Sequence, residues 1–112
     1  FTGIDTPELK QTCNKDNEIV YCGIQARQLL IDIIGKNKVH CIREGKDQYK
    51  RILAECFVNE VSLSKFLVRE GYAFAYRKYS KKFINDEDFA KKNNIGMWSM
   101  KFEYPWDWRK KN

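Results

Sequence analysis

The spacing of apolar residues predicts a helix in the first third of the chain. Five apolar residues recur at the i, i+3, i+4, i+7 and i+8 positions that form one face of an amphipathic helix. These residues are Ala26, Leu29, Leu30, Ile33 and Ile34. The pattern predicts a helix over residues 23–34, and Gly35 is placed to end it in a left-handed conformation. Polar residues dominate positions 9–22 and predict a loop before this helix.

The middle of the chain changes to the pattern of strands. Residues 39–42 and 51–58 are rich in β-branched and aromatic side chains and predict two strands, with a polar turn over residues 44–47. The two strands are expected to form an antiparallel hairpin. Ser62 then has the side chain of a helix cap, and we expect a short helix from there to Gly71.

The two ends of the chain give weaker patterns. Residues 1–4 are expected to be the end of a strand, and the aromatic residues 72–79 are expected to be extended. A further helix is predicted over residues 82–93, with Gly96 ending it. Residues 102–109 have no period, and their aromatic side chains are expected to pack back on the domain.

Composition limits the class of protein. The chain has 112 residues, which suits one domain with a single core of modest size. A hydrophobic content of 43% excludes a disordered chain. Twenty-one Lys and Arg residues against fifteen Asp and Glu residues give a net charge of +6, which favours an anionic partner such as nucleic acid. No apolar run approaches the roughly twenty residues that span a bilayer, so no membrane partner is expected.

The cysteines indicate the compartment. Cys13, Cys22, Cys41 and Cys56 contain no Cys-x-x-Cys pair, and the chain has one histidine, His40, so the pattern disfavours a zinc site. Cys13 and Cys22 would close a short polar loop, and Cys41 and Cys56 fall on the two strands of the predicted hairpin. Two disulfides and an exported protein are the favoured interpretation. Four reduced cysteines in a cytoplasmic protein remain the alternative.

Two carboxylates lie close together near the first residue. Asp5 and Glu8 flank Pro7, which fixes its own φ and favours an extended Thr6, so both carboxylates are expected on a stiffened bend. The alternative is that Asp5 or Thr6 only caps a turn. A carboxylate that activates water, a bound divalent cation and a guanidinium are what hydrolysis of a phosphodiester requires.

Arg51 is the candidate guanidinium, because it stands where the second strand leaves the polar turn. The alternative is that it only pairs with Glu44 or Asp47 across that turn. His40 lies in the first strand of the hairpin, and we interpret it as structural.

Beyond these residues, five short motifs are spread over nearly the whole chain, and their order and spacing can be compared with those of known families. They are Gly3-Ile4-Asp5-Thr6-Pro7-Glu8, Gln25-Ala26-Arg27, Asp47-x-Tyr49-x-Arg51-x-Leu53-Ala54, Leu67-Val68-Arg69-Glu70-Gly71-Tyr72-Ala73-x-Ala75-Tyr76 and Gly96-Met97-Trp98. Together they resemble the staphylococcal-nuclease, or thermonuclease, family. The four cysteines and the tail Pro105-Trp106-x-Trp108-Arg109 resemble the exported bacterial branch of that family.

The resemblance implies an α+β fold, an OB-fold barrel of five strands with three helices, as a single nuclease-like domain over residues 1–112. It also implies a Ca²⁺-dependent hydrolase that cleaves DNA and RNA with little sequence preference. Such an enzyme attacks the 5′ P–O bond and leaves 3′-phosphates. The rival function is a non-catalytic OB domain that binds nucleic acid and has lost the chemistry.

The resemblance also implies roles for single residues. Asp5 resembles the carboxylate ligand of calcium, and Thr6 the residue whose backbone carbonyl binds the same ion. Glu8 resembles the general base that orients or deprotonates the attacking water. Arg51 resembles one of two arginines that bind the scissile phosphate.

Further residues resemble the substrate-binding positions of the family. Tyr49 would lie by the terminal phosphate, and Tyr76 would line the nucleotide pocket. Lys50 stands where the family often has glycine, and it would add positive charge to the pocket. The tyrosine that usually follows Tyr76 two positions later is replaced by Lys78, with Tyr79 next to it.

The resemblance also implies features that would precede Phe1. The second phosphate-binding arginine and another calcium-binding aspartate would precede that residue, and so would the first strands of the barrel. We therefore expect an N-terminally incomplete domain, with an open barrel or with strands supplied by another copy. We also expect these 112 residues by themselves to have little nuclease activity. No obligate protein partner is evident.

Overall fold

The fold mixes helices with three small sheets, as the predicted α+β class requires. The computed structural model describes residues 1, 3–46, 48–50, 52–76 and 81–112. In chain order the elements are β1 (Ile4–Asp5), β2 (Cys13–Lys15), β3 (Glu18–Val20), α1 (Cys22–Ile34), β4 (His40–Lys46), β5 (Ile52–Val58), β6 (Val61–Ser62), α2 (Leu63–Arg69), β7 (Phe74–Ala75), α3 (Ile84–Lys92), the 3-10 helix η1 (Gly96–Ser99) and α4 (Pro105–Lys111). None of the helices described is long and apolar enough to cross a membrane.

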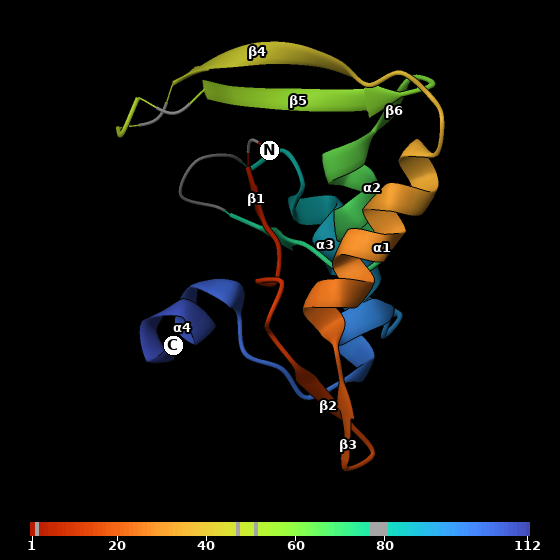
Figure 1. The fold of residues 1–112 in the computed structure, drawn as a ribbon, viewed down its shortest axis with the longest axis vertical. Coiled ribbons are helices and arrows are strands. Elements are labelled where there is room, and N and C mark those ends of the chain that lie inside the picture. Colours follow the sequence, from red (N-terminus) through yellow and green to blue (C-terminus); the bar gives the residue numbers. More distant parts are fainter. Residues whose placement is uncertain (2, 47, 51, 77–80) are drawn as a thin grey trace.

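The largest sheet has the order β4-β5-β6 and lies across one end of the molecule, above α1 and α2 (Figure 1). Its strands are antiparallel, and Cys41 on β4 is directly opposite Cys56 on β5. The predicted hairpin and the disulfide between these two cysteines are therefore confirmed. Val58 and Leu63 are buried below the sheet against the apolar face of α1.

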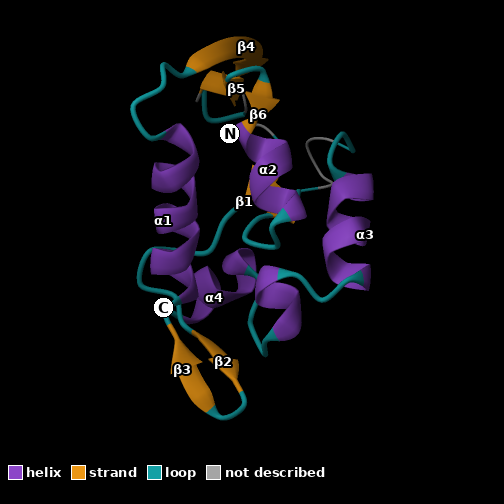
Figure 2. Cartoon of the chain, turned by 90° about the vertical axis from the view of Figure 1, so that its right-hand side faces the viewer, coloured by secondary structure: helices purple, strands orange, loops and turns teal. Residues whose placement is uncertain are grey.

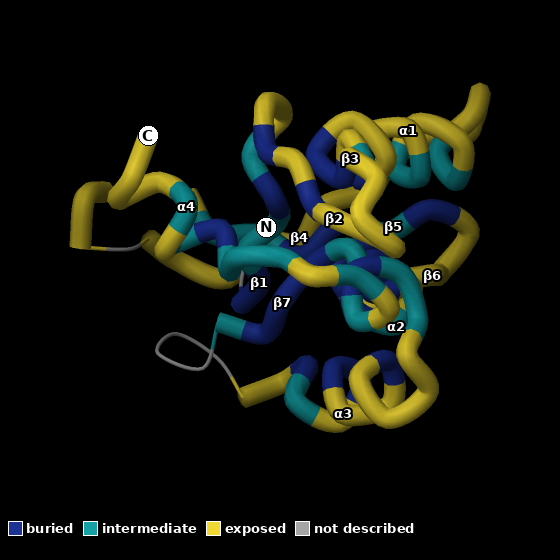
Figure 3. The backbone as a smooth tube through the Cα atoms, turned by 90° about the horizontal axis from the view of Figure 1, so that it is seen from below, coloured by how far each residue is buried: buried dark blue, intermediate teal, exposed yellow. Residues whose placement is uncertain are grey.

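The β2–β3 hairpin lies at the opposite end, and the three helices α1, α2 and α3 occupy the space between (Figure 2). The second predicted disulfide, Cys13–Cys22, joins β2 to the first residue of α1 and is confirmed. The third sheet is two-stranded and pairs β1 with β7 in the middle of the molecule, where Ile4 of β1 and both residues of β7 are buried (Figure 3).

The predictions of α1, α2 and α3 are confirmed with small changes of boundary. The first helix ends at Ile34 with Gly35 as its cap. Ser62 caps α2, and its Oγ accepts a hydrogen bond from the backbone N–H of Lys65 at 3.2 Å. The helix predicted over residues 82–93 is α3, which ends at Lys92. Gly96 does not end this helix; it has a φ of 59° and begins η1.

Two segments predicted to be irregular are regular in the structure. Residues 9–22 contain the β2–β3 hairpin, because Asp16 and Asn17 adopt φ values of 53° and 67° and form a tight turn. The tail contains α4, because Pro105 is buried in its first turn, where a missing N–H costs nothing. The tail's aromatic rings do pack back on the domain around Phe74.

The predicted turn at residues 44–47 was placed too early. Strand β4 continues to Lys46 through an irregularity between Arg43 and Gly45, whose φ of 125° suits glycine. Asp47 lies outside the described residues.

The complete OB-fold barrel of five strands with three helices, which the family resemblance implies, is not closed in the described ranges, and an open barrel was the expectation for these residues. Within the described ranges there are four α-helices, and the strands form sheets of two, two and three strands without closing a barrel. β4 is an edge strand of its sheet, and all seven of its residues are exposed.

Candidate active site

The backbone of β1 and β7 fixes the position of Asp5. Asp5 is opposite Phe74 in the antiparallel ladder, and the backbone N–H of Tyr76 donates to the carbonyl of Gly3 at 2.8 Å. β7 is held in turn by α3, because the backbone N–H of Ala75 donates to Oε2 of the buried Glu87 at 2.6 Å. Asp5 is therefore the last residue of a short strand that is anchored on β7.

The loop after β1 fixes the position of Glu8. The backbone N–H of Glu8 donates to Oε1 of Gln11 at 3.2 Å, and the backbone N–H of Gln11 donates back to the carbonyl of Glu8 at 2.8 Å. The Gln11 side chain, which is 1% exposed, also donates from Nε2 to the carbonyl of Glu103 at 2.8 Å. The buried amide of Gln11 therefore ties the Glu8 loop to the C-terminal segment.

The carboxylates of Asp5 and Glu8 converge on one guanidinium, that of Arg109 in α4. Nη2 of Arg109 lies 2.5 Å from Oδ2 of Asp5, and Nη1 donates to Oδ1 of Asp5 at 3.1 Å. The same Nη1 donates to Oε1 of Glu8 at 2.8 Å. The predicted bend therefore brings its two carboxylates onto the same guanidinium.

The electrostatics of this cluster keep Arg109 charged. The hydrogen bond to Asp5 raises the pKa of the Arg109 guanidinium the most, and the bond to Glu8 and the charges of both carboxylates raise it further, against the opposing effect of burial. The Asp5 side chain is 14% exposed and the Glu8 side chain 42% exposed. Asp5 is thus largely shielded, whereas Glu8 has access to water.

Aromatic stacking positions α4 for this contact. The Trp106 ring stacks on Tyr104, with ring centres 4.8 Å apart and planes 6° apart, and it also stacks on Tyr76 at 5.8 Å and 16°. Tyr76 directly follows β7, so the stack joins α4 to the strand that pairs with β1. Sequence reasoning missed the role of Arg109, although the tail motif Pro105-Trp106-x-Trp108-Arg109 was a signal that could have pointed to it.

The model of the Staphylococcal nuclease homologue family matches residues 1–100. The chain belongs to the staphylococcal nuclease family. The resemblance seen in the sequence motifs is therefore confirmed. The family's OB-like α+β class agrees with the mixture of helices and small sheets in the part of the chain described here.

Curated relatives with nuclease names also match the chain. "Probable staphylococcal-like nuclease CAN3" of Oryza sativa subsp. japonica is 32% identical over 111 residues, covering 96% of this chain and 27% of that protein. An "Uncharacterized endonuclease" of Haemophilus influenzae is 29% identical, covering 86% of this chain and 50% of that protein. A "Micrococcal nuclease" of Shigella flexneri is 28% identical, covering 96% of this chain and 64% of that protein. The chain thus spans between 27% and 64% of the length of these three relatives.

The other site residues expected from the family lie at different places. Thr6 lies between the two carboxylates in the sequence, and Tyr76 contacts the α4 stack. Tyr49 is 68% exposed in the turn between β4 and β5. Lys50 follows it with a φ of 63°, a left-handed conformation that favours the glycine often found there in the family.

Arg51, the predicted phosphate-binding residue, lies outside the described residues, as do Lys78 and Tyr79. Its role stays a prediction.

Asp5 and Glu8 offer carboxylate oxygens, which are the type of donor that a hard divalent cation prefers. Calcium takes roughly six to eight oxygen ligands, and carboxylates and backbone carbonyls are typical ones. Asp5 and Glu8 already converge on a positive group, so this position favours a cation. Within the described ranges no group of three or more His, Cys, Asp or Glu side chains could hold a metal ion.

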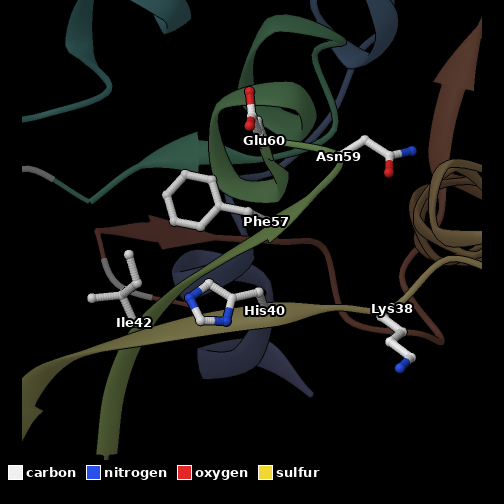
Figure 4. A pocket seen from close by; sticks show the side chains of 6 residues that line it. All are labelled: Lys38, His40, Ile42, Phe57, Asn59 and Glu60. Atoms are coloured by element: carbon white, nitrogen blue, oxygen red, sulfur yellow. The ribbon is translucent and has the colours of Figure 1, made fainter.

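A separate hollow of about 340 Å³ lies on the β4–β5 hairpin (Figure 4). Its lining residues are Lys38, His40, Ile42, Phe57, Asn59 and Glu60. It shares no residue with the cluster of Asp5, Glu8 and Arg109. The side chain of His40 lies on exposed β4 opposite Phe57, and its interpretation as a structural residue stays a prediction.

Proposed function

We propose that the chain carries the catalytic centre of a calcium-dependent nuclease that hydrolyses DNA and RNA with little sequence preference and leaves 3′-phosphates. The observation that carries this proposal is the convergence of the Asp5 and Glu8 carboxylates on one positive group, the guanidinium of Arg109. Metal-assisted phosphodiester hydrolysis uses carboxylates that can hold a cation and activate water. Relatives named as nucleases support the same reaction class.

Glu8 is the general base in this proposal. Its side chain is 42% exposed, so water can reach the carboxylate, whereas the Asp5 side chain is 14% exposed. Glu8 orients the water and accepts its proton as the oxygen attacks phosphorus. The bond from phosphorus to the 5′ oxygen breaks, and that oxygen leaves after taking a proton from solvent.

Asp5 and the backbone carbonyl of Thr6 would hold the calcium ion, which when bound offsets negative charge on the phosphate oxygens. Arg51 would bind the same phosphate through its planar guanidinium. Tyr49, Lys50 and Tyr76 would contact the rest of the substrate. Tyr76 is already held parallel to Trp106, and flat aromatic faces of this kind accept bases by stacking.

The protein is proposed to work in an exported, oxidising compartment, periplasmic or extracellular. The two disulfides support this, because such bonds persist outside the reducing cytoplasm.

The second candidate function is a non-catalytic domain that binds nucleic acid. Two observations favour it. Arg109 pairs with both carboxylates, and a net charge of +6 attracts phosphate without any chemistry.

The Glu8→Gln variant of the natural full-length protein tests the proposal. On single-stranded DNA with calcium, we expect cleavage by the variant to fall by about 100-fold or more, because removal of a general base typically costs 10²–10⁴-fold. Quantified release of 3′-phosphate ends is the measurement.

Glu18→Gln is the matched control, because it removes the same charge from an exposed position of β3. It should cleave at the wild-type rate. Equal cleavage by wild type and Glu8→Gln would overturn the assigned mechanism. Binding of DNA without cleavage by the wild type would favour the non-catalytic alternative.

A further inference from the structure

Arg109 forms hydrogen bonds to the carboxylate of Asp5, which is also the proposed ligand of the calcium ion. Both oxygens of Asp5 accept hydrogen bonds from it, through Nη2 at 2.5 Å and Nη1 at 3.1 Å. Calcium binds carboxylate oxygens at roughly 2.3–2.6 Å and would use the same kind of lone pair that accepts these hydrogen bonds. A guanidinium engaged on both oxygens of Asp5 takes one lone pair of each oxygen, and it therefore competes with a divalent ion for that side of the carboxylate.

The contact to Glu8 makes Arg109 a bridge between two like charges. Two carboxylates held close together repel each other, and in a partly shielded place this repulsion is weakly screened by water. Nη1 of Arg109 donates to both Oδ1 of Asp5 and Oε1 of Glu8, so one positive group offsets the repulsion. Without a cation at this position, the two side chains would be expected to separate.

Arg109 is placed so that it can hold this bridge and also release it. Its helix is anchored by buried Pro105 and by the stack of Trp106 on Tyr104 and Tyr76, so the backbone stays beside β1 and β7. The Arg109 side chain itself is 41% exposed. A long, half-exposed side chain on a fixed helix can turn to solvent without moving the rest of the site.

We infer that Arg109 is a positioning residue that acts as the resident cation of this site: it holds Asp5 and Glu8 together and competes with the divalent cation for Asp5. The inference rests on the calcium site of the proposed function. The family model matches residues 1–100, so Arg109 and its contacts to Asp5 and Glu8 come from the part of this chain that follows the match. A metal ion that binds on the side of Asp5 now taken by Arg109 must displace the guanidinium from at least one oxygen.

Calorimetric titration of the metal-free natural protein with calcium chloride tests the inference. Arg109→Gln removes the competing charge and should bind calcium about tenfold more tightly than wild type. Arg109→Lys keeps the charge but loses the planar fork that bonds two oxygens at once, so its affinity should fall between the two. Lys110→Gln is the matched control, because it removes one positive charge from the next residue of the same helix, and it should change the affinity less than twofold.

The calcium concentration for half-maximal cleavage should fall in parallel in Arg109→Gln. An affinity of Arg109→Gln equal to or weaker than that of wild type would overturn the inference, as would an equal gain in Lys110→Gln. If Arg109→Gln does not fold, as judged by circular dichroism, Arg109→Lys decides, and an affinity not above wild type overturns the inference.

These results separate the inference from the proposed function. Wild type that binds calcium and cleaves DNA, with no change in Arg109→Gln, contradicts the inference alone. Absence of calcium binding in every variant contradicts both. Calcium binding by Arg109→Gln in the absence of binding by wild type would support the inference most strongly.

Discussion

Single acidic residues in this fold are held in shielded places by specific donors. The Glu55 side chain on β5 is 7% exposed, and its Oε1 accepts a hydrogen bond from Lys82. Burial raises the pKa of Glu55, but the hydrogen bonds from Lys82 and Ser62 and the charge of Lys82 together lower it below its usual value. The net effect shows that the ionised form of Glu55 is favoured by folding.

The lowered pKa of Glu55 predicts a loss of stability in acid. A carboxyl group whose pKa is lower in the folded state stabilises the fold above its unfolded pKa of 4.5, and this contribution disappears as the pH falls through the folded pKa. Glu55→Gln should therefore lower the free energy of unfolding by about 1–2 kcal/mol at pH 7. The difference from wild type should shrink below pH ~4.

Urea unfolding at pH 7, 4 and 3 is the measurement for this prediction. Glu18→Gln, at an exposed position of β3, should match wild type at every pH. A constant difference between Glu55→Gln and wild type across the three pH values would show that ionisation of Glu55 does not contribute.

Contacts between elements depend on glycines at points of close approach. A Cβ on Gly23, in the first turn of α1, would lie 1.9 Å from the backbone carbonyl oxygen of Glu8. A Cβ on Gly71 would lie 2.0 Å from the carbonyl of Ile95, and one on Gly96 would lie 2.3 Å from the carbonyl of Glu70. These glycines let α1 reach the loop that carries Glu8 and let η1 reach the end of α2.

Gly23→Ala should damage both the fold and the site. Alanine favours helices by about 1 kcal/mol over glycine, but the clash with the Glu8 backbone outweighs this, since overpacking costs roughly 1–3 kcal/mol. We expect a lower melting temperature and slower cleavage, because the Glu8 loop must move away from α1.

Calorimetric melting and the DNA cleavage assay measure the two effects of Gly23→Ala. Arg27→Ala, at an exposed position of the same helix, is the control and should melt within a few degrees of wild type. A Gly23→Ala protein that is more stable than wild type would contradict the close approach.

At the scale of the whole molecule, two disulfides secure opposite ends. Cys41–Cys56 joins the strands of the largest sheet, and Cys13–Cys22 joins β2 to α1. The largest sheet and the β2–β3 hairpin lie at opposite ends of the cartoon in Figure 2. Their sequence separations are 15 and 9 residues. The exposed edge strand β4 remains available for pairing, and strand exchange with another copy stays a prediction.

Removal of either disulfide should destabilise the protein by about 3 kcal/mol on loop entropy alone. We expect Cys13→Ser with Cys22→Ser to cost more than Cys41→Ser with Cys56→Ser. Cys13 and Cys22 are 6% and 0% exposed, so the first change buries two hydroxyl groups in a core.

Melting temperatures with and without a thiol reductant test this prediction. Wild type should lose stability in reductant, whereas the variant that lacks all four cysteines should not respond. Equal melting of wild type in both conditions would argue against formed disulfides and against an oxidising compartment.

The sequence by itself determined the features that depend on neighbouring positions. Apolar periodicity located α1, a capping serine located α2, and the β-rich runs located the β4–β5 hairpin together with its cysteine pair. Ordered motifs indicated the family, which the comparison confirmed. The sequence also singled out Asp5 and Glu8, because a proline between two nearby carboxylates is a local signal.

The tertiary structure decided what occupies those carboxylates. Arg109 is 104 residues from Asp5 and 101 from Glu8 along the chain, and no periodicity or turn signal connects such positions. The stack of Trp106 on Tyr76, next to the strand that pairs with β1, holds α4 beside these carboxylates. The tail that looked irregular is therefore the element that supplies the positive charge of the site.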